Sequence, residues 1–264
     1  MLNHISTKIV ATVALMVLVV GVAIASHSCG NYHWARTSNP FTVKLGDNVS
    51  SSWDSYLGTT SADWSVSGVL DTAIVVGGTN PKSCKPVRGR VEVCNAKYGN
   101  NGWLGLAQIW VSGDHIAKAV TKLNDFYFNT AKYNTPGWRN LVMCQEVGHA
   151  FGLDHQDEVF NNPNLGTCMD YTNDPDGTLN GQFSNEHPNQ HDYDQLEAIY
   201  THLDSGSTLS QSLSGASQNK NNGNLENSAE WGKGLRQDGR GRTSLYERDL
   251  GRGEKLFTFV FWSE

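Results

Sequence analysis

Residues 144–155 read Cys-Gln-Glu-Val-Gly-His-Ala-Phe-Gly-Leu-Asp-His, and this stretch decides the fold. On a helix, Gln145 and His149 are four positions apart and share one face. The second glycine can end the helix in a left-handed turn, so that the chain doubles back and brings His155 to the same point. Glu146 lies beside that face, where its carboxylate can hold a water on a metal. Three donor side chains and one open position are the arrangement found in catalytic zinc sites.

The segment resembles the H-E-x-x-H-x-x-G-x-x-H motif of the metzincin metallopeptidases, which a methionine turn follows. This chain has Q-E-x-x-H-x-x-G-x-x-H, and then Gly-Thr-Cys-Met-Asp-Tyr over residues 166–171. The resemblance implies that Met169 is the methionine whose side chain lies under the metal. It also implies that Tyr171 is the tyrosine that, in some subfamilies, ligates zinc or stabilises the oxyanion.

The resemblance further implies Zn²⁺ as the cofactor, with the metal held by Gln145, His149 and His155. Glu146 is then the general base that takes a proton from the bound water and passes it to the leaving amine. Zinc and Tyr171 would stabilise the tetrahedral oxyanion. The catalytic residues implied are therefore Glu146 and Tyr171.

The similarity extends over roughly residues 40–204. Residues 105–111 are similar to the edge strand that lines the cleft in matrixin-like members, and residues 188–203 resemble their closing helix. The implied fold is α+β: a metzincin-like catalytic domain with a mixed twisted sheet, an active-site helix and a C-terminal helix. A peptide or protein substrate would lie extended along the edge strand by β-augmentation.

Gln145 departs from the family pattern, because the first zinc ligand there is a histidine. An amide oxygen is a harder ligand and is rarer on zinc than a neutral imidazole. Three interpretations stay open. Gln145 ligates weakly and the enzyme is active, or the site is degenerate and the protein is a binding module. In the third, another side chain completes the site, the candidates being Asp157, His187 and His191.

The sequence therefore predicts a secreted zinc-dependent endopeptidase that hydrolyses peptide bonds with a metal-activated water. The retention of Glu146 favours activity, since a dead site has no use for a general base beside two histidines. One alternative is a catalytically silent metzincin-like domain that binds peptide or glycan. Another is a surface adhesion protein whose C-terminal hairpin is the functional part.

The N-terminus is typical of a secretory signal peptide. Lys8 precedes an uncharged apolar run over residues 9–24, which overlaps an A-x-A pattern ending at Ala25. The run is short for a membrane span, so we expect cleavage after Ala25, secretion, and no membrane association afterwards. An uncleaved anchor is the alternative.

Export implies an oxidising compartment, in which the five cysteines are expected to form disulfides. Cys84 and Cys94 flank a predicted hairpin and are close in sequence. Cys144 and Cys168 both border the candidate site and would tie it together. Cys29 is left over, and other pairings remain open.

The order of apolar runs and turn residues predicts the remaining elements. Strands are expected at residues 41–45, 69–76, 89–93 and 105–111, and helices at 53–64, 135–151 and 190–203. Residues 114–128 fit a helix or a strand. Residues 243–249 and 255–262 flank a Gly-Arg-Gly-Glu turn and predict a hairpin that docks on the main domain or pairs with another strand.

These elements suggest four parts. They are a signal peptide (1–25), a metzincin-like peptidase domain (26–204), a low-complexity Ser/Asn/Gly linker (205–230) and a C-terminal β-hairpin extension (231–264).

The net charge of −6 makes binding to nucleic acid through its phosphates a poor prospect. Residues 140–219 contain no lysine or arginine, which concentrates negative charge there. Oxygen ligands suited to Ca²⁺ are available from Asp154, Asp157, Asp170, Asp174 and Asp176, although no EF-hand spacing is present. Calcium therefore stays open as a second cofactor. We expect a monomer.

Overall fold

The computed structural model describes residues 26–209 and 227–264. The predicted signal peptide and most of the predicted linker lie outside the described residues. Among the described helices, none is both long enough and apolar enough to cross a membrane.

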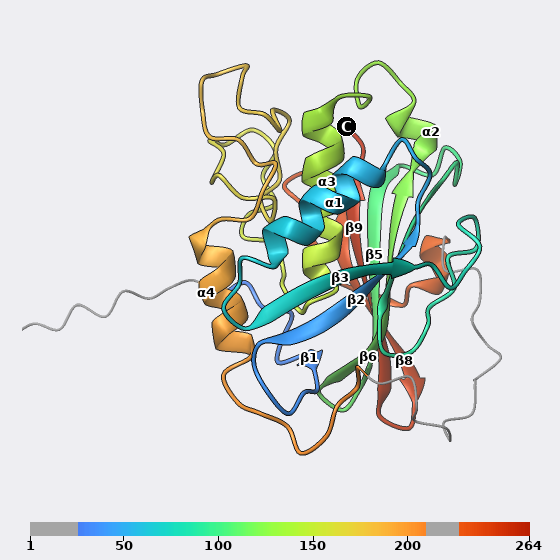
Figure 1. The fold of residues 1–264 in the computed structure, drawn as a ribbon. Helices are drawn as coiled ribbons and strands as arrows, with labels where there is room; N and C mark the ends of the chain where they lie inside the picture. Colours follow the sequence, from blue (N-terminus) through green and yellow to red (C-terminus); the bar gives the residue numbers. More distant parts are fainter. Residues whose placement is uncertain (1–25, 210–226) are drawn as a thin grey trace, which may run out of the picture.

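The fold is α+β, with a mixed sheet of nine strands and few helices (Figure 1). The strands are β1 (His33–Trp34), β2 (Phe41–Asn48), β3 (Leu70–Val76), β4 (Val91–Ala96), β5 (Trp103–Ser112), β6 (His115–Asn124), β7 (Lys233–Gln237), β8 (Thr243–Gly251) and β9 (Glu254–Trp262). The helices are α1 (Asp54–Trp64), α2 (Asp125–Phe128), α3 (Pro136–His149), α4 (Gln190–Ile199) and the 3-10 turn η1 (Ser228–Glu230).

The sheet has the strand order β3-β2-β4-β6-β5-β9-β8-β7, with β1 paired to β6. Strands β3, β2, β4 and β6 run parallel to their neighbours in that half. From β6 onward every pair is antiparallel. The predicted C-terminal hairpin is therefore present as β8 and β9, and it continues the sheet of the main domain through β5.

Helix α3 carries the candidate site and begins where its local sequence predicts. The Thr135 hydroxyl accepts a hydrogen bond from the Trp138 N–H at 3.3 Å, and a proline occupies the first turn. Gly152 follows the helix with φ +95°, and a Cβ there would lie 2.3 Å from the Tyr32 carbonyl oxygen. Only glycine fits this reversal, which sends the chain back toward the site.

Helices α1 and α3 pack against each other and against the sheet, α1 over β3 and α3 over β5 and β6 (Figure 1). The Trp64 indole N–H of α1 donates to the Cys144 carbonyl of α3 at 3.1 Å, which fixes the two helices in register. Helix α3 is thus buried between α1 on one side and strands β5 and β6 of the sheet on the other.

The structure resolves one open expectation and differs from two others. Residues 114–128 form β6 followed by the short α2, because cross-strand pairing with β4 and β5 satisfies their backbone on both sides. Helix α4 ends at Ile199, four residues before the expected end. Strand β7 was not predicted, since all five of its residues are exposed and carry no apolar alternation.

Candidate active site

The two histidines of the motif meet at their Nε2 atoms, which lie 2.9 Å apart. The Nδ1 of His149 bonds the Leu153 carbonyl at 3.0 Å, and the Nδ1 of His155 bonds the Glu158 carboxylate at 2.6 Å. A carbonyl and a carboxylate only accept, so each Nδ1 carries a hydrogen and the two Nε2 atoms face each other. Two such nitrogens approach this closely only with a proton or a metal ion between them, and hydrogen bonds of this kind at Nδ1 orient metal-binding histidines.

Gln145, one helical turn before His149 on α3, offers an amide oxygen as a third donor. Its Nε2 donates to the Cys168 carbonyl at 2.7 Å, which orients the amide. Its Oε1 is buried and has no hydrogen-bond partner, a costly state for a polar atom. A neutral donor set of two imidazoles and this orphaned oxygen fits a divalent metal such as Zn²⁺.

The three alternative third donors contact other protein groups, and His191 lies in a cluster with His27 and Asp192. His187 Nδ1 lies 2.7 Å from the Asp63 carboxylate, and His191 stacks on the ring of His27. Asp157 accepts hydrogen bonds from the Val159 N–H and the Asn162 side chain.

Glu146 is fully buried on the face of α3 that meets β5. Neither carboxyl oxygen makes a hydrogen bond of normal geometry. Burial raises the pKa of Glu146 well above its usual value, and the nearby N–H groups of Phe261 and Ala107 offset only part of this. Gly105 permits the close approach, because a Cβ there would lie 2.5 Å from the Glu146 Oε1.

Met169 packs directly against helix α3. A Cβ placed on Gly148 would come within 2.7 Å of the Met169 sulfur, and both residues are fully inside the core. The disulfide Cys144–Cys168 joins α3 to the turn that carries this methionine.

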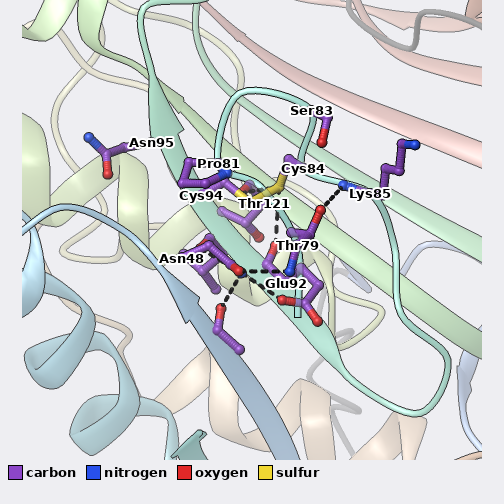
Figure 2. Close-up of a disulfide and its surroundings, with 12 residues drawn as sticks. Asn48, Thr79, Pro81, Ser83, Cys84, Lys85, Glu92, Cys94, Asn95 and Thr121 are labelled. Atoms are coloured by element: carbon purple, nitrogen blue, oxygen red, sulfur yellow. Dashed lines mark hydrogen bonds between the residues drawn. A yellow bond between two sulfur atoms is a disulfide. The ribbon is translucent and has the colours of Figure 1, made fainter. Parts of the chain in front are cut away.

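The second disulfide, Cys84–Cys94, joins the segment after β3 to strand β4 (Figure 2). Asn48 bridges this region, accepting from the Thr79 N–H at 3.1 Å and donating to the Glu92 carboxylate at 2.6 Å. Cys29 is a buried free thiol, and burial raises its pKa well above the usual value.

Tyr171 is buried beside the histidines, with its ring 4.6 Å from that of His155. Its hydroxyl donates to the carbonyl of Val260 at 2.8 Å. Burial raises the pKa of Tyr171 well above its usual value, so the phenol is a hydrogen-bond donor at neutral pH.

The C-terminal strand covers the site, which was not expected. Strand β9 pairs with β5 along its length, so β5 is an interior strand and not the open edge that the resemblance implied. The Phe259 ring stacks on His149 with centroids 4.1 Å apart and planes 10° apart. Consequently Gln145, Glu146 and His149 have no exposed surface, and His155 has 5%.

Sequence reasoning missed three side chains that support the site. The Glu158 carboxylate holds His155 and accepts from the Ser244 hydroxyl at 2.9 Å. Arg236 of β7 pairs with Asp154 at 2.6 Å. The i, i+3 spacing of His155 and Glu158 could have predicted their pairing from the sequence. No sequence pattern predicts the contacts of Ser244 and Arg236, because both residues come from the C-terminal segment.

The aspartates considered for calcium bond to protein donors instead. Asp154 pairs with Arg236, and one Asp170 oxygen accepts from the Leu165 N–H and the Asn185 side chain. Asp174 accepts from the Leu179 N–H. Within residues 26–209 and 227–264, no cluster of three possible metal ligands combines two of those aspartates.

Comparison with known proteins adds little to this geometry. No family model matches the chain, and no curated protein matches it. Among solved structures, the chain is similar to high choriolytic enzyme 1 of the medaka fish Oryzias latipes, a hatching enzyme zinc-protease. Sequence identity is 12%, the TM-score is 0.36, and the match covers 64% of this chain and 94% of that one. A likeness at this TM-score carries no argument, so the function has to be inferred from the site itself.

Proposed function

We propose that the chain is a secreted zinc-dependent endopeptidase of the metzincin type. The observation that carries the proposal is the convergence of the His149 and His155 Nε2 atoms at 2.9 Å, with the unpartnered buried oxygen of Gln145 one helical turn before His149 on α3. Buried polar atoms without partners are rare in folded proteins, and an amide oxygen is a donor that a metal ion can take.

The residues of the chain have defined roles in this proposal. Gln145, His149 and His155 would hold Zn²⁺, which when bound acts as a Lewis acid and lowers the pKa of a water. The Glu146 carboxylate accepts a proton from the attacking water and passes it to the leaving amine. The Tyr171 hydroxyl donates a hydrogen bond to the substrate carbonyl, and β5 aligns the peptide backbone.

The same site admits a second candidate, a silent domain of this fold that binds peptide. The observation that favours it is the complete burial of Gln145, Glu146 and His149 beneath β9. In that case β5 and β9 form a permanent pair, and the buried carboxyl of Glu146 has no chemical task.

The deciding experiment is casein hydrolysis by the zinc-loaded chain. Hydrolysis is measured with the intact chain and again after the chain is cut at a protease recognition sequence inserted between Leu209 and Ser210. Glu146→Gln is expected to lower hydrolysis about 10²–10⁴-fold with zinc content unchanged. Glu197→Gln, an exposed change on α4, is the matched control and should keep full activity. Hydrolysis that survives Glu146→Gln or metal chelation would overturn the proposal.

A further inference from the structure

Strand β9 occupies the place where a substrate would add to β5. The two strands are antiparallel, with Leu106 opposite Val260 and Ala107 opposite Phe259. An extended peptide that binds a sheet edge uses the same main-chain hydrogen bonds. The chain therefore carries its own peptide in the proposed substrate position.

One peptide group of β9 lies between the two proposed catalytic side chains. The Val260 carbonyl accepts from the Tyr171 hydroxyl at 2.8 Å, and the N–H of Phe261, on the other side of the same peptide bond, faces the Glu146 carboxyl. In the proposed chemistry the hydroxyl serves a substrate carbonyl and the carboxyl serves the departing nitrogen. The bond between residues 260 and 261 thus has the placement of a substrate bond.

Side chains on both sides of this peptide hold it in place. Phe259 stacks on His149, and the Phe261 ring lies 4.6 Å from that of Tyr171. Both phenylalanines are buried, with 0% and 1% of their surface exposed. An external peptide cannot reach the site while these rings occupy it.

Contacts from β7 and the turn after it fasten the C-terminal segment, residues 233–264, to the loop that carries His155. Arg236 pairs with Asp154 at 2.6 Å and approaches Glu158 at 3.7 Å. The Gly239 N–H donates to the Glu158 carbonyl at 2.8 Å. Release of β9 therefore requires these contacts to break as well.

We propose that β9 is an internal pseudo-substrate that keeps the peptidase latent, and that the substrates are extended peptides with apolar residues around the cleaved bond. This inference rests on the proposed function. A nick between Leu209 and Ser210 removes the covalent tether, so the segment's high effective concentration at the cleft is lost.

The test compares casein hydrolysis by the zinc-loaded chain before and after the nick. We expect the nick to raise hydrolysis at least tenfold, and a synthetic peptide of residues 254–264 to suppress it again. In the intact chain, Arg236→Ala is expected to raise hydrolysis severalfold. Arg252→Ala, at the exposed hairpin tip, is the control and should leave it unchanged.

The outcomes separate the two proposals. If intact and nicked chains hydrolyse casein equally and Glu146→Gln abolishes both activities, the peptidase stands and the pseudo-substrate is wrong. If neither form hydrolyses casein at all, the proposed function fails, and the pseudo-substrate with it.

A different set of side chains carries a second, independent inference. The Nε2 atoms of His33, His115 and His202 lie 3.4, 3.1 and 3.5 Å from one oxygen of Asp204. The edge of a tetrahedron with metal–ligand bonds of about 2.0–2.1 Å is about 3.3–3.4 Å. The four groups come from β1, the start of β6 and the segment after α4, and the three histidines line a surface cavity of about 460 Å³.

The hydrogen bonds around this cluster point to a cation. His33 Nδ1 donates to the Asn31 carbonyl at 2.6 Å, which leaves Nε2 facing the Asp204 carboxylate. Arg36 holds the other Asp204 oxygen at 3.1 Å, which orients the carboxylate. A lone pair facing a carboxylate oxygen is repulsive unless a proton or a metal lies between them.

We propose that His33, His115 and Asp204, whose ligand atoms lie within 4.8 Å of one another, bind one zinc ion apart from the proposed active site. Imidazole nitrogens with a single carboxylate favour Zn²⁺ over Ca²⁺. The metal would join the N-terminal strand to the segment that follows α4.

Zinc stoichiometry measured by equilibrium dialysis against Zn²⁺ tests this site without any activity assay. His33→Gln and His115→Gln are expected to lose one zinc per chain relative to the wild type. His187→Gln, which changes a histidine that is about as exposed as His115 and is paired with Asp63, should lose none. Equal zinc content in the wild type and the two variants would mean that a proton bridges the cluster, and would overturn the site.

Discussion

In the proposed metal site, Gln145 would set how strongly the metal is held. Its amide is already oriented by the Cys168 carbonyl, and its Oε1 is the buried oxygen left without a partner. An amide oxygen is a weaker zinc donor than an imidazole nitrogen, so the residue lowers affinity without removing the site.

Substituting Gln145 should therefore shift zinc affinity in both directions. Gln145→His is expected to tighten zinc binding about tenfold or more, because imidazole is the better donor. Gln145→Ala should weaken it, since one ligand is lost. A competition titration with a chelator measures all three proteins, and identical affinities would show that Gln145 is not a ligand.

Asp170, next to Tyr171, gives a pH dependence of stability. Burial raises its pKa to about 6 from the usual 3.8, against hydrogen bonds from Leu165 and Asn185 that lower it. The folded state therefore holds this proton more tightly than the unfolded chain does. The resulting stability is present below about pH 3.8 and is lost as the pH rises through about 6.

Asp170→Asn should remove the loss of folding stability at rising pH, because the amide cannot ionise. Between pH 4 and pH 7 the free energy of unfolding of the variant is expected to gain about 2–3 kcal/mol relative to the wild type. Urea denaturation at several pH values gives the difference. Parallel curves for the two proteins would contradict the assignment.

At the scale of elements, the packing of α3 on the methionine turn depends on one small residue. Gly148 faces the Met169 sulfur and the Trp64 ring, each 2.7 Å from where a Cβ would be. Trp64 is fully buried and held by its bond to the Cys144 carbonyl, so it has no room to move.

Gly148→Ala is accordingly expected to destabilise the fold by about 1–3 kcal/mol through overpacking. Gly58→Ala in α1 is the matched control, because nothing lies within 4 Å of its added Cβ. That change should be neutral or stabilise by up to about 1 kcal/mol, since alanine favours helix. Thermal unfolding of both variants measures the contrast, and equal effects would rule out the steric explanation.

At the scale of the whole molecule, the C-terminal hairpin is part of the central sheet. Strand β9 has β5 on one side and β8 on the other, and its middle residues are buried. The ends of the main sheet path are β3 and β7.

Hydrogen exchange should reflect this arrangement. The amides of β9 are expected to exchange as slowly as those of β5, and those of the exposed β7 much faster, because interior strands open only with the core. Mass spectrometry of exchanged peptides resolves the three strands. Fast exchange throughout β9 would show that the hairpin is a loosely attached extension.

Much of the fold was predictable because it depends on near neighbours in the chain. The Thr135 cap, the proline after it and Gly152 set the limits of α3 to within two residues, and the apolar runs marked β2 to β5. The ambiguity at residues 114–128 had a physical cause: helical spacing and a strand buried on both faces look alike over a short span.

What the sequence alone determined is the local chemistry: the helix that carries Gln145, Glu146 and His149, the turn that returns His155, and the methionine that follows. Tertiary structure decided what surrounds them. Val260 meets Tyr171 across 89 positions of the chain, and no local pattern encodes such a pairing. Phe259, Arg236 and Ser244 reach the site only because β9 adds to β5. Backbone hydrogen bonding between strands is the same for any sequence, so the choice of partner is made by how the assembled faces pack.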